Sequence, residues 1–223
     1  MFLGADLARA QNNPSYYTFL VASGFLCDPG DSATCPAAVR SADGDSYEMS
    51  GAGTFDSQSK SVTAAGAFAH KSPNGTLLET GVWIASELIS FNSYGIDPDA
   101  LMSGGRAFSH LPFRPKRLPI SLGPVPTGGL AVFRIRLLPI SGATKTAVLQ
   151  VNCALGDVPR ERSVEGIRLT FQSNGPEFPE ELAGRVMFLS MRPEVTTPAR
   201  TPTQEPAPDS AVPPSSERQK PVM

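Results

Sequence analysis

Apolar and polar residues alternate with period two along most of the segment from residue 47 to residue 91. In its first part, residues 47–55, Tyr47, Met49 and Phe55 share one parity, while polar or small residues occupy the other. Successive side chains of a β-strand point to opposite faces, so this spacing is typical of a strand that is buried on one face. The segment therefore restricts the chain to folds that are built on β-strands.

Two polar turns divide this segment into three predicted antiparallel strands. Residues 56–60 form a short polar connection, after which the alternation resumes at residues 62–68. At residues 72–75, Ser-Pro-Asn-Gly supplies the proline and the Asn-Gly pair that favour a tight reversal. The third stretch, residues 76–91, is long for one strand and carries apolar residues on both parities. This is expected of a strand that bends between two sheets or crosses a barrel wall.

The rest of the chain adds strand patterns and no helix pattern. No stretch holds a 3.6-residue apolar repeat of helix length, which argues against alternating β-α architectures. Residues 180–182 favour one helical turn at most. Further strands are predicted at residues 16–25, 130–138, 146–154, 164–171 and 185–191. We therefore predict an all-β fold, a single antiparallel β-sandwich or β-barrel of about eight strands with a disordered C-terminal tail.

Composition divides the chain of 223 residues into one domain and two flanking segments. Residues 193–223 contain eight prolines and no aromatic residue, leucine or isoleucine. Such a segment buries too little apolar surface to offset the entropy of ordering it, so we predict a disordered, partly polyproline-like spacer. A specific proline-motif ligand is the alternative. The β-domain is predicted to span residues 14–192, after a leader of residues 1–13.

Three cysteines bear on the compartment in which the chain folds. Cys27 and Cys35 bracket a short loop that can bring the two thiols together, whereas Cys153 lies inside an apolar strand pattern. We predict a Cys27–Cys35 disulfide. A zinc site is disfavoured because paired short ligand spacings are absent and only His70 and His110 could contribute. Three reduced, buried cysteines are the other alternative.

The first residues resemble the end of a secretory signal peptide. Residues 7–10, Leu-Ala-Arg-Ala, place small residues at the two positions that a signal peptidase reads. Residues 1–10 are too short for a complete signal peptide, so either the true start lies upstream or the likeness is accidental. Together with the predicted disulfide, the pattern favours an extracytoplasmic protein, periplasmic or extracellular. No stretch approaches the roughly 20 apolar residues of a transmembrane helix.

Positive charge is concentrated in one irregular region. Residues 100–156 contain seven basic residues and no acidic residue, although the whole chain has a net charge of −2. Much of this charge falls in a predicted loop at residues 104–129, which suggests an anionic partner. Nucleic acid is disfavoured because the protein is slightly acidic and carries no nucleic-acid-binding motif. Packing of the loop against the acidic first half of the chain is the alternative.

Motifs of the common catalytic classes are absent. The sequence contains no G-x-S-x-G, no phosphate-binding G-x-x-x-x-G-K-[ST], no H-E-x-x-H and no dinucleotide fingerprint. Ser57 and Lys60 match S-x-x-K formally, but they lie in a predicted turn without the companion motifs of that chemistry. No cofactor and no metal site are predicted.

Candidate site residues are therefore chosen by residue type and position. Glu87, His70 and Tyr94 carry groups suited to general acid-base catalysis. If the long strand lines a barrel, Trp83 and Phe91 would form the apolar wall of a ligand pocket near Glu87 and Tyr94. The alternative is that these aromatic side chains are simply part of the core.

Several short stretches resemble features of uncharacterised exported bacterial β-proteins. They are GFLCD at 24–28, GAGTF at 51–55 with G-x-F at 66–68, GVW at 81–83, SFNSYG at 90–95 and VNC at 151–153. The resemblance spans roughly residues 20–190 and implies an exported β-domain, without implying an activity or a catalytic residue. A more distant architectural similarity is to allene oxide cyclase and dirigent barrels, whose motifs do not match position by position.

Two functions of different classes follow. The first is a secreted, non-enzymatic β-domain that binds a ligand or acts in surface interaction. The alternative is a small barrel cyclase or isomerase that acts on an apolar small molecule through Glu87 or Tyr94. Self-association is open to either, because exposed glycine-rich strands pair readily edge to edge.

Overall fold

The computed structural model describes residues 15–96, 124–172 and 175–191. These residues form eleven strands of one antiparallel sheet and two short 3-10 helices, which confirms the predicted all-β class. The strands are β1 (Tyr16–Val21), β2 (Ala37–Arg40), β3 (Ser46–Asp56), β4 (Val62–Lys71), β5 (Leu77–Ile96), β6 (Val125–Pro139), β7 (Lys145–Cys153), β8 (Gly166–Phe171), β9 (Glu177–Phe178), β10 (Glu180–Ala183) and β11 (Val186–Met191). The 3-10 helices are η1 (Gly24–Leu26) and η3 (Arg160–Arg162).

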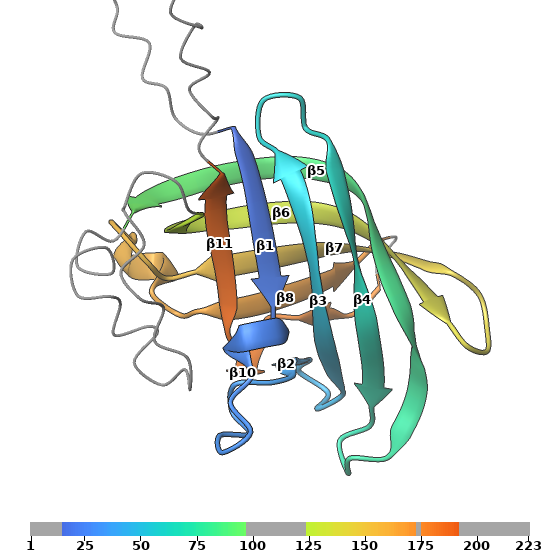
Figure 1. Cartoon of the computed structure of the whole chain (residues 1–223). Helices are drawn as coiled ribbons and strands as arrows, with labels where there is room; N and C mark the ends of the chain where they lie inside the picture. Colours follow the sequence, from blue (N-terminus) through green and yellow to red (C-terminus); the bar gives the residue numbers. More distant parts are fainter. Residues whose placement is uncertain (1–14, 97–123, 173–174, 192–223) are drawn as a thin grey trace, which may run out of the picture. The chain divides into compact units, whose positions relative to one another are not determined.

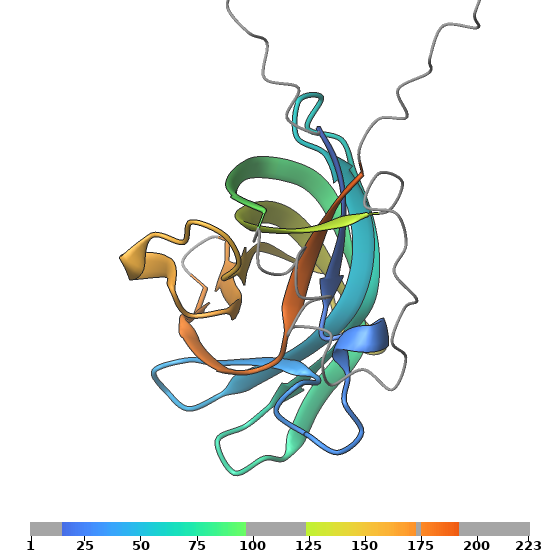
Figure 2. The same cartoon turned by 60° about the vertical axis from the view of Figure 1, so that its left-hand side comes forward.

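Hydrogen-bonded pairing closes six of these strands into a ring. β3, β4, β5, β6, β11 and β1 each pair with the next, and β1 pairs back with β3. Two arms branch from the ring: β2 and β10 from β3, and β7, β8 and β9 from β6. Figure 1 shows β7 and β8 crossing behind β1 and β3, and the turned view of Figure 2 shows the sheet curving over its own inner face. The sheet is not a regular barrel, and neither the predicted sandwich nor the predicted barrel is confirmed.

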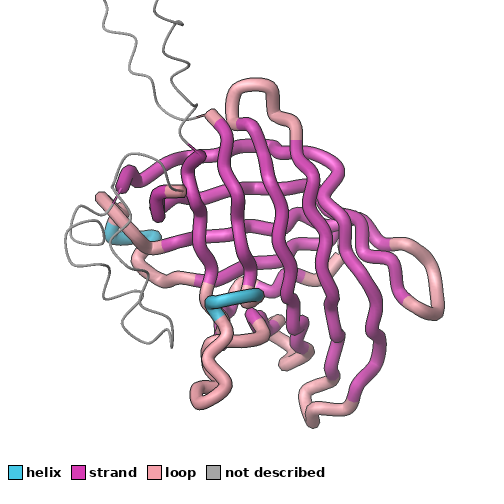
Figure 3. The backbone as a smooth tube through the Cα atoms, viewed as in Figure 1, coloured by secondary structure: helices cyan, strands magenta, loops and turns pink. Residues whose placement is uncertain are grey.

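Two long strands change partners part-way along their length. One side of β3 pairs with β2 over residues 46–49 and with β1 over residues 51–56. β6 likewise pairs with β11 over residues 125–127 and with β7 over residues 129–137. β3 and the glycine-containing β4 both have partners on two sides. β3 and β4 therefore offer no free edge for the edge-to-edge self-association that was predicted for glycine-rich strands. Figure 3, coloured by secondary structure, shows that strands make up most of the described backbone.

Bulges explain why β5 carries apolar residues on both parities. Register shifts against β6 follow Ala85 and Leu88, and each adds one residue to β5. An extra residue exchanges the side chains that face inwards with those that face outwards. Trp83, Leu88 and Phe91 therefore all pack into the core although their parities differ. The bending that the sequence predicted for this strand arises in this way.

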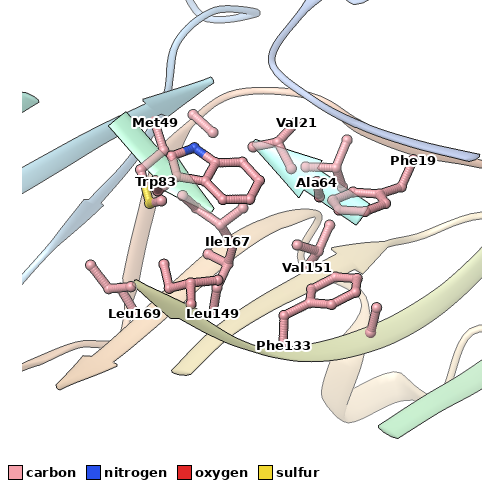
Figure 4. Packing of buried hydrophobic residues seen from close by; sticks show 14 of the residues in the cluster. Phe19, Val21, Met49, Ala64, Trp83, Phe133, Leu149, Val151, Ile167 and Leu169 are labelled. Carbon is pink, nitrogen blue, oxygen red and sulfur yellow. The ribbon is translucent and has the colours of Figure 1, made fainter. Parts of the chain in front are cut away.

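The inner face of the sheet encloses a core of aromatic and aliphatic side chains (Figure 4). Trp83 is fully buried, and its indole Nε1 donates a hydrogen bond to the Ser50 carbonyl at 3.0 Å. The indole lies against glycines of β3 and β4. A Cβ at Gly51 would come 2.5 Å from Trp83 Cζ2, and one at Gly66 would come 2.5 Å from Nε1. Only glycine leaves room for the indole, so these inward-facing glycines are packing positions.

The eight predicted strands are all present, and the three that the sequence did not indicate are the short β2, β9 and β10. The helical turn favoured at residues 180–182 is wrong, because these residues belong to β10, which pairs with β2. β1 ends at Val21 rather than at residue 25. Ala22 has φ +39° and Gly24 has φ +61°, and these left-handed angles are incompatible with an extended strand.

β6 begins earlier than the sequence suggested. The irregular basic loop was predicted to extend over residues 104–129, but residues 125–129 belong to β6. The basic side chains of that loop lie outside the described residues, as do the leader and the C-terminal tail, so what was predicted for them stays a prediction. These side chains are Arg106, His110, Arg114, Lys116 and Arg117.

The predicted disulfide is confirmed. Cys27 and Cys35 are joined, with their Cα atoms 5.4 Å apart, and Cys153 is a buried free thiol in β7. Burial, followed by the negative charge of Glu165, raises the pKa of the Cys153 thiol to about 12. The thiolate is the reactive form of cysteine, so Cys153 serves as a packing residue. Across the described ranges, no helix combines the length and the hydropathy needed to cross a bilayer.

Candidate functional site

The core has two chemically different ends, which lie at opposite ends of β3. At one end, a pocket of about 460 Å³ opens between β1, β5 and β6. This open-end pocket is lined by Tyr17, Ser57, Phe91, Ser93, Gly95, Ile96 and Thr127. At the other end, polar and charged side chains close the core. This closed-end cluster consists of Asp45, Tyr47, His70, Glu79 and Lys145.

Aromatic rings form one wall of the open-end pocket. Tyr17 of β1 packs against Phe91 of β5 with ring centroids 4.6 Å apart, and it stacks on Phe55 of β3 at 5.2 Å. Phe91 also meets Phe188 of β11 edge-on at 5.3 Å. Offset and edge-on ring pairs add to the energy of area burial and fix the rings relative to one another. Phe55 and Phe188 thus hold in place the two rings, Tyr17 and Phe91, that line the pocket.

A glycine makes room for this wall. Gly129 of β6 pairs with Ser93 of β5, and a Cβ added to Gly129 would come 2.7 Å from Phe91 Cε2. A carbon contact that short is repulsive, so any other residue at this position would displace the Phe91 ring. The absence of a side chain at Gly129 therefore allows the Phe91 ring to occupy its position in the pocket wall.

Hydroxyl groups supply the polar part of the open-end pocket. Burial raises the pKa of the Tyr17 phenol, and a hydrogen bond with the Ser93 side chain offsets part of that rise. The phenol is therefore protonated at neutral pH and able to donate. Thr127 Oγ1 donates to the Val125 carbonyl at 3.0 Å. No described lining residue carries a charge at neutral pH, so the pocket suits an uncharged molecule.

The closed-end cluster is a row of groups on neighbouring strands. Tyr47 of β3 pairs with His70 of β4, which pairs with Glu79 of β5. The His70 ring stacks on the Tyr47 ring with centroids 4.4 Å apart and planes 8° apart. His70 Nε2 lies 3.4 Å from Asp45 Oδ2, and Lys145 Nζ donates to Glu79 Oε2 at 2.6 Å. The register of β3, β4 and β5 thus aligns Tyr47, His70 and Glu79, and Asp45 and Lys145 reach this row from outside those three strands.

Electrostatics at this end keep the Tyr47 phenol protonated. Burial raises its pKa, and the negative charges of Glu79 and Asp45 raise it further. Phe178 packs edge-on against Tyr47 with centroids 4.9 Å apart. His70 Nε2 is buried and makes no hydrogen bond to the described residues. Stacked rings and charges of opposite sign therefore seal this end of the core.

The structure separates residues that the sequence grouped into one site. Trp83 and Phe91 both point inwards, but of the two only Phe91 lines the open-end pocket, because Trp83 is fully buried in the core. Glu87 lies on the outer face with 51% of its side chain exposed, and its Oε2 accepts a hydrogen bond from Arg134 Nε at 2.8 Å. The predicted proximity of Glu87 to Trp83 and Phe91 fails because the bulges of β5 turn Glu87 outwards.

Tyr94 is also turned away from the open-end pocket. It is the extra residue at a third register shift of β5, between Ser93 and Gly95. Its hydroxyl donates to Asn152 Oδ1 at 2.9 Å, and its carbonyl accepts from the Asp157 amide at 2.8 Å. Tyr94 is 5% exposed and anchors the loop that follows β7. His70, the third acid-base candidate, belongs to the closed-end cluster.

Sequence reasoning did not identify Tyr17 or Ser93 as pocket residues. Tyr17 lies in a strand beside Tyr16, and nothing in the local sequence shows which of the two rings faces a pocket. One signal was available: Gly128 and Gly129 directly precede the predicted strand at residues 130–138, and glycine in a strand often marks a close approach by another group.

Comparisons with protein-family models, with curated proteins and with solved structures found no match to this chain. Within the described ranges, no group of three or more His, Cys, Asp and Glu side chains is arranged to hold a metal ion. The candidate site is therefore interpreted from its geometry and chemistry.

Proposed function

We propose that this chain is an exported, non-enzymatic β-domain whose open-end pocket binds a small, uncharged and mainly apolar molecule. The observation that carries the proposal is a pocket of about 460 Å³ with an aromatic wall and no charged side chain among its described lining residues. Small-molecule sites are commonly clefts of about 300–1,000 Å³ with apolar walls and a few placed polar groups.

The ligand chemistry follows from the lining. Tyr17, Phe91 and Ile96 offer apolar surface, and burying such surface contributes about 25 cal/mol per Å². The Tyr17 phenol and the Ser93 hydroxyl offer one polar position at which a hydroxyl or carbonyl group of the ligand would be oriented. A charged ligand would lose its hydration without finding a counter-charge, which is strongly unfavourable. The ligand is therefore uncharged, with at least one hydrogen-bonding group.

Export is supported by the covalent structure. The Cys27–Cys35 disulfide forms and persists in oxidising compartments, such as the periplasm and the extracellular space. Cys153 is a buried free thiol, so it does not compete with Cys27 and Cys35 for disulfide formation. These features favour folding outside the cytoplasm.

Binding is favoured over catalysis by the positions of the acid-base candidates. Glu87 is paired with Arg134 on the outer face, and Tyr94 is bonded to Asn152 beneath a loop. Neither lines the open-end pocket. Tyr17 does line it, but a phenol whose pKa is raised is not a base at neutral pH. Glu87 and Tyr94, the residues through which a cyclase or isomerase was predicted to act, therefore supply no acid-base group to this pocket.

The test uses 1-aminoanthracene, a small uncharged probe whose fluorescence rises on transfer to an apolar site. We expect saturable binding by the oxidised full-length chain. Ser93→Phe fills the pocket and is expected to weaken binding at least tenfold, about 1.4 kcal/mol. Ser90→Phe is the matched control, because Ser90 lies on the same strand but is exposed on the outer face. It is expected to bind the probe as the unaltered protein does.

Native mass spectrometry of the protein recovered from its own source adds an independent readout. We expect a co-purifying molecule of low mass that is absent from the Ser93→Phe variant. Absence of saturable probe binding, or equal weakening by Ser93→Phe and Ser90→Phe, would contradict the proposal.

A further inference from the structure

A second cavity lies on the outer face of the sheet, over β7 and β8. Its volume is about 190 Å³, well above the roughly 10–15 Å³ that one water molecule needs. Gln150 and Asn152 alternate along β7 with the core residues Leu149 and Val151, so they point away from the core. This outer-face cavity is lined by, among others, Gln150, Asn152, Glu161, Arg162, Arg168 and Glu181.

Asn152 fixes the shape of the outer-face cavity. Its Nδ2 donates to the carbonyls of Arg162 at 2.8 Å and Val164 at 2.6 Å, and its Oδ1 accepts from the Tyr94 hydroxyl at 2.9 Å. Two donors and one acceptor of a single amide are thus used to hold the η3 segment over the sheet. The cavity wall is therefore preformed rather than dependent on a ligand.

The polar groups of the cavity are only partly satisfied by the protein. The Glu181 side chain is 8% exposed, and its Oε1 accepts from Arg168 Nε at 3.0 Å. Its Oε2 accepts no hydrogen bond from the described residues, and the side-chain amide of Gln150, which pairs across strands with Arg168, makes none with them either. Glu181 Oε2 is not buried without a partner, so it is accessible in the cavity and able to accept a hydrogen bond from a ligand.

The charges of the outer-face cavity are balanced. Two guanidinium groups, of Arg162 and Arg168, stand with two carboxylates, of Glu161 and Glu181. An anion alone would be attracted by the first pair and repelled by the second, and a cation alone would meet the reverse. A molecule that carries one charge of each sign matches both pairs at once.

The geometry points to a second binding site, in which the outer-face cavity takes a zwitterionic molecule of the size of a free α-amino acid. The ammonium group donates to Glu181 Oε2, and the carboxylate accepts from the guanidinium groups of Arg162 and Arg168. The side-chain amide of Gln150 makes a further hydrogen bond with the bound molecule. The outer-face cavity and the open-end pocket share no lining residue.

The experiment is a two-dimensional NMR titration of the full-length chain with each free L-amino acid, up to about 10 mM. We expect at least one amino acid to shift the amide resonances around Gln150 and Arg168 saturably. Its N-acetyl amide, which carries neither charge, is expected to bind at least tenfold more weakly. If no amino acid produces saturable shifts, or if the N-acetyl amide binds equally well, the inference is overturned.

Variants assign the binding to the cavity. Glu181→Gln and Gln150→Leu are each expected to weaken binding at least tenfold, and Gln150→Leu leaves the Arg168–Glu181 ion pair intact. Glu180→Gln is the matched control on the same strand, since the Glu180 carboxylate is 57% exposed and pairs with Arg40 at 3.8 Å. Equal weakening by Glu180→Gln and Glu181→Gln would overturn the assignment.

The two binding sites are tested separately. Ser93→Phe is expected to leave amino-acid binding unchanged, and Glu181→Gln is expected to leave 1-aminoanthracene binding unchanged. Failure of either proposal is therefore distinguishable from failure of the other.

Discussion

Tyr17 and Tyr47 are both buried, inward-facing tyrosines at opposite ends of the same core, and burial raises the pKa of both phenols. Their surroundings differ. Tyr17 faces a pocket whose described lining residues carry no charge, with Ser93 as its polar neighbour. Tyr47 is stacked on His70 and lies near Glu79 and Asp45, among paired charges. One end of the core is open and neutral, and the other is closed and charged.

The comparison shows how a single sheet produces two kinds of environment. The closed end uses cross-strand neighbours, so each inward side chain there meets a partner from the adjacent strand. At the open end, β6 exchanges β7 for β11 between Gly129 and Thr127, and β1 and β11 close the ring. The pocket lies where these strands meet, and the aromatic side chains that line it leave one side free for a ligand. The partner exchange of β6 and the small Gly129 thus accompany the open end.

Truncating the two tyrosines provides the strongest test of this comparison. Tyr47→Ala leaves a closed cavity and unsupported charges, and we expect it to lower the free energy of unfolding by about 3–5 kcal/mol. Tyr17→Ala enlarges a pocket that already exists, so its cost is expected to be roughly half as large. Urea unfolding measures both losses. Tyr16→Ala is the control, because Tyr16 is 45% exposed and its truncation should cost within about 0.5 kcal/mol.

Equal losses for Tyr17→Ala and Tyr47→Ala would contradict the comparison. They would mean that the open end is packed as tightly as the closed end.

Removing one cation from each of two ion pairs tests whether the closed end depends on charge matching. Lys145→Met leaves Glu79 unpaired with 13% of its side chain exposed, and we expect a loss of about 1–3 kcal/mol. Arg134→Met leaves Glu87 unpaired at 51% exposure, where water replaces the partner, so the loss should stay below about 1 kcal/mol. Thermal and urea unfolding of both variants provide the measurement.

The double variant Lys145→Met with Glu79→Gln sharpens this result. It should recover part of the stability lost in Lys145→Met, since no buried charge is then left unpaired. No recovery would indicate that Lys145 acts through packing instead.

Alkaline pH is expected to weaken the fold gradually, with a contribution from both ends of the core. Because burial raises the folded-state pKa of Tyr17 and Tyr47, the folded protein keeps two protons that the unfolded chain releases above about pH 10. The stability that they contribute is complete below that pH and is lost as the pH rises through the folded-state values. We expect unfolding free energies to fall by at most about 1.4 kcal/mol per pH unit for each tyrosine.

The variants Tyr17→Phe and Tyr47→Phe assign this pH dependence. Each is expected to remove one part of the decline between about pH 10 and 11.5, measured by urea unfolding at a series of pH values. An unchanged slope in both variants would show that other groups cause the decline.

Much of the fold was predictable because strand periodicity is a local property. Tyr47, Met49 and Phe55 share a parity in the sequence and are all buried on the inner face. The short strands β2, β9 and β10 were not predictable, since two to four residues carry too little pattern and acquire strand geometry only by pairing with a neighbour.

The candidate site was predictable only in part. Phe91 was expected in a pocket wall and lines one, whereas Glu87 was expected beside it and lies on the opposite face. Alternation assigns both residues to the same parity, and the bulge that separates them arises from the pairing of β5 with β6. A bulge leaves little trace in the sequence of the strand that contains it.

The sequence by itself determined the all-β class, the inward face of most strands and the Cys27–Cys35 disulfide, because each depends on residues that are close along the chain. Only the tertiary structure decided how the sheet closes, which tyrosine lies in a pocket and where the charges are paired. Tyr17 meets Phe91, and Lys145 meets Glu79, through contacts between distant segments. Such contacts depend on strand register and partner exchange, which are set by the packing of the whole core.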